Sequence, residues 1–136
     1  MPEAATLKRA RRDKRAGKAP STQAGEFVRE EMHQIREGKH GARSTKQAIA
    51  IGLSKARRAG VDPGPPPASA KRTTKQSAKS ASRAAKSGKR PSRRRSRSSL
   101  RALKREGRGA ATTKALSRQA KSAANTRRRR RRTSSA

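Results

Sequence analysis

The side chains able to do chemistry in this sequence are overwhelmingly cationic. Of its 136 residues, 40 are Lys or Arg and 8 are Asp or Glu, which gives a net charge of +32 at pH 7. Residues 63–136 hold 25 of these cations and a single acid, Glu106. A side chain that neutralises a phosphate releases condensed counterions, so a chain of this charge binds dense polyanions strongly. The composition therefore predicts a polyanionic partner.

Enzymatic chemistry has little support in the sequence. It contains no Gly-rich phosphate-binding loop, no Cys nucleophile and no convincing Ser–His–Asp set. His33 and Glu37 are four residues apart and His40 follows closely, but no further metal ligand is evident. We expect a protein that is not an enzyme and that has no catalytic residues, no cofactor and no metal site.

The predicted nucleic-acid-binding residues form several groups. One group lies at the end of a predicted helix, where it would orient that helix. Another recurs at helical spacing in the tail, so it would form a basic stripe once phosphates neutralise it, although like charges oppose that helix when alone. The whole set is Lys55, Arg57, Arg58, Lys71, Arg72, Lys75, Lys79, Arg83, Lys86, Lys89, Arg90, Arg93, Arg94, Arg95, Arg97, Arg127, Arg128, Arg129, Arg130, Arg131 and Arg132.

The elements that must position these cations are poor in apolar residues. Only 28% of the residues are hydrophobic, and Phe27 is the sole aromatic. Low hydrophobicity combined with high net charge is the signature of disorder. We therefore predict a mostly disordered chain with all-α elements. Its parts are a basic disordered arm (1–20), a helical region (21–61), a Pro-rich linker (62–70) and a basic Lys/Arg/Ser/Ala tail (71–136).

The helical region predicts an αα-hairpin over about residues 24–59. Val28, Met32 and Ile35 form one apolar stripe. A second helix begins near Ser44, and Gly52 would let the two backbones approach closely. The apolar area is small for an independent core, so we expect the hairpin to need self-association, nucleic acid or another protein.

The sequence of the tail predicts two short helices, at about residues 99–106 and 113–124. The segment around residues 106–114 is similar to residues 37–46, one residue shorter. Two interpretations of this similarity stay open. The tail holds a degenerate second hairpin that packs beside the first or binds another nucleic-acid segment, or the low complexity of the tail produces the similarity by chance.

Residues 26–57, with EFVREEMHQIREGKHG followed by STKQAIAIGLSKAR, resemble a family of short basic bacterial proteins. It is a domain-of-unknown-function family with Lys/Ala/Arg-rich tails. The resemblance implies a bacterial, cytoplasmic protein and carries over no catalytic residue. In composition alone, the tail also resembles the C-terminal domains of linker histones and their bacterial analogues.

These observations predict non-specific binding of duplex DNA by a nucleoid-associated, cytoplasmic protein that neutralises phosphates and compacts the nucleic acid. Duplex DNA is preferred over RNA because a chain with one aromatic residue lacks stacking platforms for single strands. One alternative is an RNA- or ribosome-associated basic protein. Another is a protein-interaction hairpin with a basic localising tail. Membrane binding is not expected, because no apolar amphipathic face accompanies the tail.

Overall fold

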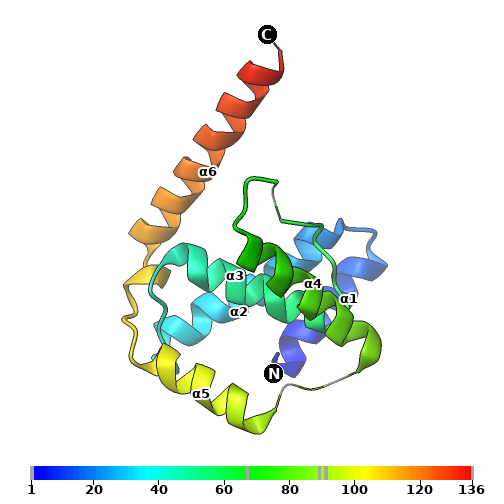
Figure 1. Ribbon diagram of the computed structural model, residues 1–136, viewed down its shortest axis with the longest axis vertical. Helices are drawn as coiled ribbons and strands as arrows, with labels where there is room; N and C mark the ends of the chain where they lie inside the picture. The colour runs from blue at the N-terminus through cyan, green and yellow to red at the C-terminus, as the bar shows by residue number, and fades with distance from the viewer. Residues whose placement is uncertain (1, 67, 89, 91, 136) are drawn as a thin grey trace.

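The computed structural model describes residues 2–66, 68–88, 90 and 92–135 (Figure 1). Within these ranges the chain forms six α-helices and one short 3-10 helix, η1, and has no strand. The helices α1 to α4 pack into a body, and α5 and α6 extend from it (Figure 1). The bounds are α1 Ala4–Arg15, α2 Pro20–Arg36, α3 Thr45–Arg58, α4 Arg72–Ser87, α5 Arg93–Lys104, η1 Gly109–Ala111 and α6 Thr113–Ser134.

The centre of the body is the antiparallel pair α2 and α3. The hydroxyl of Ser44 accepts a hydrogen bond from the backbone N–H of Gln47 at 3.1 Å, which caps α3 where the sequence predicts its start. Gly52 lies directly against α2, since a Cβ atom there would be 2.6 Å from the Cα of Val28. The close approach expected at Gly52 is therefore confirmed.

Helix α1 packs against α2 and completes one of two small cores. This core consists of buried Ala10, Ala24, Phe27 and Ala56, with partly buried apolar side chains around it. Helix α4 covers the opposite side of α3 and buries Ala78 and Ala81. The hairpin thus receives from its own chain part of the covering that its small apolar area requires.

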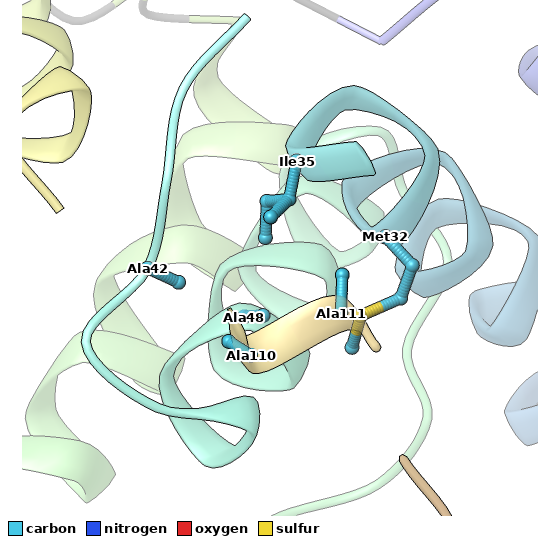
Figure 2. Close-up of a cluster of buried hydrophobic side chains, with 6 residues drawn as sticks. All are labelled: Met32, Ile35, Ala42, Ala48, Ala110 and Ala111. Atoms are coloured by element: carbon cyan, nitrogen blue, oxygen red, sulfur yellow. The ribbon is translucent and has the colours of Figure 1, made fainter. Parts of the chain in front are cut away.

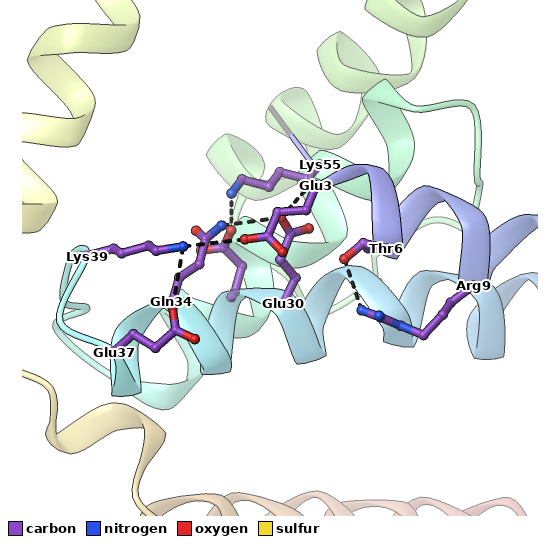
Figure 3. Close-up of polar contacts among 9 residues, drawn as sticks. Glu3, Thr6, Arg9, Glu30, Gln34, Glu37, Lys39 and Lys55 are labelled. Carbon is purple, nitrogen blue, oxygen red and sulfur yellow. Dashed lines mark hydrogen bonds and ion pairs between the residues drawn. The ribbon is translucent and has the colours of Figure 1, made fainter.

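A buried carboxylate links α2, α3 and the loop between them. The side chain of Glu31 is fully buried, and it forms an ion pair with Lys55 of α3. On its other side, Nε2 of the buried His40 lies 3.1 Å from Oε2 of Glu31. Figure 3 shows the neighbouring polar contacts, in which Glu30 accepts a hydrogen bond from the backbone N–H of Glu3 at 2.8 Å.

The second core holds the tail on the body. Its buried residues are Met32, Ile35, Ala42, Ala48, Ala110 and Ala111, with Leu116 packed against them (Figure 2). Four hydrogen bonds accompany this packing, and every acceptor is a main-chain carbonyl of the tail. They run from Gly41 N to Leu103 O, Ala42 N to Gly107 O, Thr45 Oγ1 to Ala110 O and Arg36 Nε to Ala111 O, at 2.7–3.1 Å. We call this contact the joint, formed by residues 36–45 of the body and 103–111 of the tail.

The similarity between residues 37–46 and 106–114 therefore has a structural counterpart. Each segment is a loop that ends in a hydroxyl cap, Ser44 before α3 and Thr112 before α6. The two loops lie against each other at the joint. The helices flanking the second loop, α5 and α6, do not pack together as a hairpin.

The prediction of a mostly disordered chain is wrong. The 1–20 arm expected to be disordered contains α1, the tail contains α4, α5 and α6, and α6 continues ten residues beyond the predicted end at 124. The composition argument counts large apolar side chains, whereas this fold packs helices through alanine. Alanine has the highest helix propensity and allows helices to approach closely. Buried Ala10, Ala24, Ala56, Ala78 and Ala81 all serve this purpose.

In the part of the chain that the structure describes, no helix combines the length and apolar character needed to cross a membrane.

Candidate nucleic-acid interface

Acidic residues and their cationic partners are concentrated in the body. Among the described residues, every ion pair lies between residues 3 and 55. Examples are Arg9 with Glu26 at 2.7 Å and Lys18 with Asp13 at 3.1 Å. Lys39 contacts two carboxylates, and Glu37, followed by Glu3, raises the pKa of Lys39 above its ordinary value (Figure 3). The cations described beyond residue 55 therefore have no acidic partner.

The three predicted binding residues on α3 differ in their surroundings. Lys55 is held by the buried Glu31, so its ammonium group is engaged within the protein. A guanidinium nitrogen of the half-buried Arg57 donates to the carbonyl of Gly64 at 2.9 Å, which fastens the linker to α3. Arg58 is exposed and lies in the last turn of the helix. Of the three, Arg58 is the one most available to a ligand.

Helix α4 presents the stripe that the tail sequence predicts. Lys79, Arg83 and Lys86 are exposed, and the buried Ala78 and Ala81 face α3 on the other side of the helix. Near the N-terminal end, the ammonium group of Lys75 donates to the carbonyl of Ala68 at 2.7 Å. Lys71 is the N-cap residue and Arg72 the first residue of α4, and both are exposed.

Helix α5 carries six cations in twelve residues and buries none of its side chains. Arg93 and Arg97 belong to the predicted set and are four residues apart. Arg101 and Lys104 continue the same face at helical spacing. Arg94 and Arg95 are exposed as well, and so is Arg90 before the helix. Lys89 lies outside the described residues.

Helix α6 is the longest basic element. It has 22 residues, nine cations, no acid and no buried residue. The predicted run from Arg127 to Arg132 lies within it, and six consecutive helical residues point to all sides. One face carries cations near both ends of the helix, with Asn125 between the two groups. The five cations at helical spacing on this face are Lys114, Arg118, Lys121, Arg128 and Arg132.

The body holds α6 mainly at its N-terminal end. Leu116 packs into the joint core, and the helix then projects away from the body (Figure 1). Further along, a guanidinium nitrogen of Arg130 donates to Oγ of Ser69 in the linker at 3.1 Å. On a helical projection, the face with the five cations lies opposite Leu116. Most of the stripe therefore faces away from Leu116, whereas Arg118 lines a surface pocket together with Lys46 at the start of α3.

Sequence reasoning missed five cations of these two stripes: Arg101, Lys104, Lys114, Arg118 and Lys121. The signal was present, since their spacing continues the faces of Arg93 and Arg128. It was not used because the predicted helices began at 99 and ended at 124, which separated each stripe into two pieces.

The comparisons with known proteins give one match. A family of unknown function, DUF6496, matches residues 14–66, which span the end of α1, the α2–α3 hairpin and the start of the linker. No curated protein and no solved structure shows significant similarity to the chain. The expected resemblance to a family of unknown function is thereby confirmed for the hairpin. The match ends before α4 and includes none of the three basic helices of the tail.

Proposed function

We propose that this protein binds duplex DNA without sequence specificity, neutralises its phosphates and compacts it. The bulk of the affinity comes from the exposed cations of α4, α5 and α6. Because phosphates are identical along a duplex, such contacts carry no sequence information. The same chemistry supports the further proposal of a nucleoid-associated, histone-like role in a bacterial cell, in line with the resemblance of residues 26–57.

The observation that carries the proposal is helix α6. Its nine cations have no acidic neighbour in the helix, and its side chains are unburied. At 1.5 Å per residue, 22 residues span about 33 Å. One turn of B-form DNA is about 34–36 Å long. A duplex lying along the outward stripe would therefore meet cations over about one full turn.

The aromatic content favours a duplex over single strands. Proteins that bind single strands stack bases on exposed aromatic side chains. The one aromatic residue of this chain, Phe27, has 0% of its surface exposed and belongs to the core between α1, α2 and α3. The exposed cations of α4, α5 and α6 can therefore bind the phosphate backbone, and no exposed aromatic side chain accompanies them to stack on bases.

The proposal is tested by the salt dependence of binding to a 24-bp duplex, measured by fluorescence anisotropy on the full chain. Each neutralised phosphate contributes about −0.9 to the slope of log K against log salt. Changing Arg127 to Arg132 together to Gln is expected to make the slope shallower by about 3 to 5. A matched variant with six exposed body cations that form no ion pair with a described residue changed to Gln, namely Lys8, Arg11, Arg12, Lys14, Arg15 and Arg29, is expected to change it by about 1 or less.

The same titrations with a structured RNA distinguish the alternative function. A tenfold or greater preference for the RNA at equal salt would replace this proposal with an RNA- or ribosome-associated role. A salt slope near zero on both nucleic acids would favour a protein-interaction hairpin with a localising tail.

A further inference from the structure

The joint determines where the two outermost basic helices leave the body. The carbonyl of Leu103, in the last turn of α5, accepts the N–H of Gly41 at 2.8 Å. Only nine residues further on, the hydroxyl of Thr112 caps the start of α6. Both helices are therefore fixed through one short segment, which the body holds by main-chain hydrogen bonds and by the burial of Ala110 and Ala111.

From this common point the two helices diverge. In Figure 1, α5 runs below the body and α6 rises from the left edge of the body and projects beyond it toward the top. In the described part of the chain, no other helix packs against α5, and α6 packs only on η1 and α3. Six cations on α5 and nine on α6 also repel each other. The two basic stripes are thus separate surfaces.

We propose that α5 and α6 bind two different duplex segments, so that one chain bridges two DNA helices. This inference rests on the proposed duplex binding and assigns its compaction to bridging in addition to charge neutralisation. Helix α6 alone covers about one turn of a duplex. A duplex aligned with α6 runs away from α5 and leaves its six cations unneutralised. A second duplex supplies the phosphates that these cations lack.

A sandwich assay with the full chain tests bridging. A 24-bp duplex is immobilised, saturated with protein and washed, and the retention of a second, fluorescent 24-bp duplex is measured. The α5 variant carries Arg93→Gln, Arg97→Gln, Arg101→Gln and Lys104→Gln. Gln has a helix propensity similar to that of Lys and Arg, and α5 buries no side chain, so the fold is unaffected. The matched control removes four exposed cations of α1, with Lys8→Gln, Arg11→Gln, Arg12→Gln and Lys14→Gln.

Because α5 contributes to the overall affinity, the protein is loaded to saturation on the first duplex and retention is measured per bound chain. Per bound chain, we expect the α5 variant to retain at least tenfold less of the second duplex than the unmodified chain. The α1 variant is expected to retain the second duplex nearly as well as the unmodified chain. Equal losses in the two variants would overturn the inference, because bridging would then follow net charge alone. Binding of one duplex without retention of a second would also overturn it and leave the proposed function standing. Failure to bind even the first duplex would overturn both.

Discussion

At the scale of single residues, Gly41 is the position on which the joint depends most directly. A Cβ atom at Gly41 would lie 2.0 Å from the main-chain oxygen of Glu106, a distance that no real side chain tolerates. Because the obstacle is backbone and not a flexible side chain, any larger residue must push the tail away from the body.

We therefore predict that Gly41→Val opens the joint without changing any charge. The amides of Gly41 and Ala42, which donate to the tail, should lose their protection in hydrogen exchange. The expected loss of stability is about 2 kcal/mol, from two hydrogen bonds and the exposure of the adjoining core. Gly107→Ala is the matched control, since nothing lies within 4 Å of a Cβ atom there and its φ is not in the left-handed region. Unchanged protection in Gly41→Val would contradict this account of the joint.

The buried carboxylate of Glu31 gives a second prediction at this scale. Glu31→Gln removes the charge that holds Lys55 and faces His40, while the shape of the side chain is kept. Breaking a buried ion pair from one side is strongly destabilising, and partial exposure of Lys55 reduces the cost to about 2–3 kcal/mol. Urea denaturation followed by circular dichroism measures it. The control is Glu37→Gln, whose half-exposed pair with Lys39 should contribute little. Adding Lys55→Met to Glu31→Gln should recover part of the lost stability. If Glu31→Gln and Glu37→Gln destabilise the protein equally, burial of the Glu31 carboxylate has no role in its contribution.

At the scale of secondary structure, the helical form of α6 is what aligns its five outward cations. Charge alone does not require a helix, so shape and charge can be separated experimentally. A proline inside the helix removes a hydrogen bond and clashes with the preceding turn, whereas a proline at the first helical position is tolerated.

We predict that Ala123→Pro weakens binding to a 24-bp duplex by about 3- to 10-fold at constant net charge, because the stripe is broken in the middle. Thr113→Pro, at the first position of α6, should bind like the unmodified chain. Anisotropy titrations at one salt concentration make the comparison. If the two variants bind equally well, the cations act as an unstructured polycation and the helical stripe has no role.

At the scale of the whole molecule, two electrostatic effects on stability oppose each other. A few ion pairs stabilise the folded chain, and repulsion among its many cations destabilises it. The described ion pairs are confined to residues 3–55, and several are partly exposed, so salt screening costs little stability there. Repulsion within a chain of +32 opposes the compact state as a whole.

We therefore predict that the midpoint of thermal unfolding rises by several degrees when NaCl is increased from about 20 mM to about 300 mM, over which the Debye length falls well below 10 Å. Circular dichroism at 222 nm in the absence of nucleic acid measures it. A midpoint that falls with salt would mean that the ion pairs of the body outweigh the repulsion of the tail.

How much of this arrangement could be predicted from the sequence depends on the element. Helices α2 and α3 could be predicted, because a stripe of large apolar residues and a cap at Ser44 agree with each other. Helix α1 was not predicted, and the helix of α4 was expected only once phosphates neutralise its cations. Both helices pack through alanines, namely Ala10, Ala78 and Ala81, and so lack a strong apolar signal. For α6, the helix predicted over 113–124 stops before the six arginines at 127–132, yet the helix continues through them.

The interface shows the same division. The cations themselves could be found from the composition. The stripe on α4 could be found from the helical spacing of its Lys and Arg residues. The joint could not, since its hydrogen bonds join residues 36–45 to 103–111, which are distant in sequence. The similarity between the two loops was visible, but similarity alone does not say that the loops touch. Likewise, the involvement of Lys55 with Glu31 is a tertiary contact that the position of Lys55 at the end of a helix does not reveal.

The chemistry of the joint has a consequence for how this tail can evolve. All four acceptors on the tail are main-chain carbonyls, and these are supplied by any amino acid. Small side chains are required at Ala110 and Ala111. The other residues of the tail segment 103–111 can change without loss of these hydrogen bonds. The demanding half of the contact, including Gly41, Ala42 and Thr45, lies instead in the matched domain. Related chains can therefore share this hairpin and carry tails that no longer resemble one another.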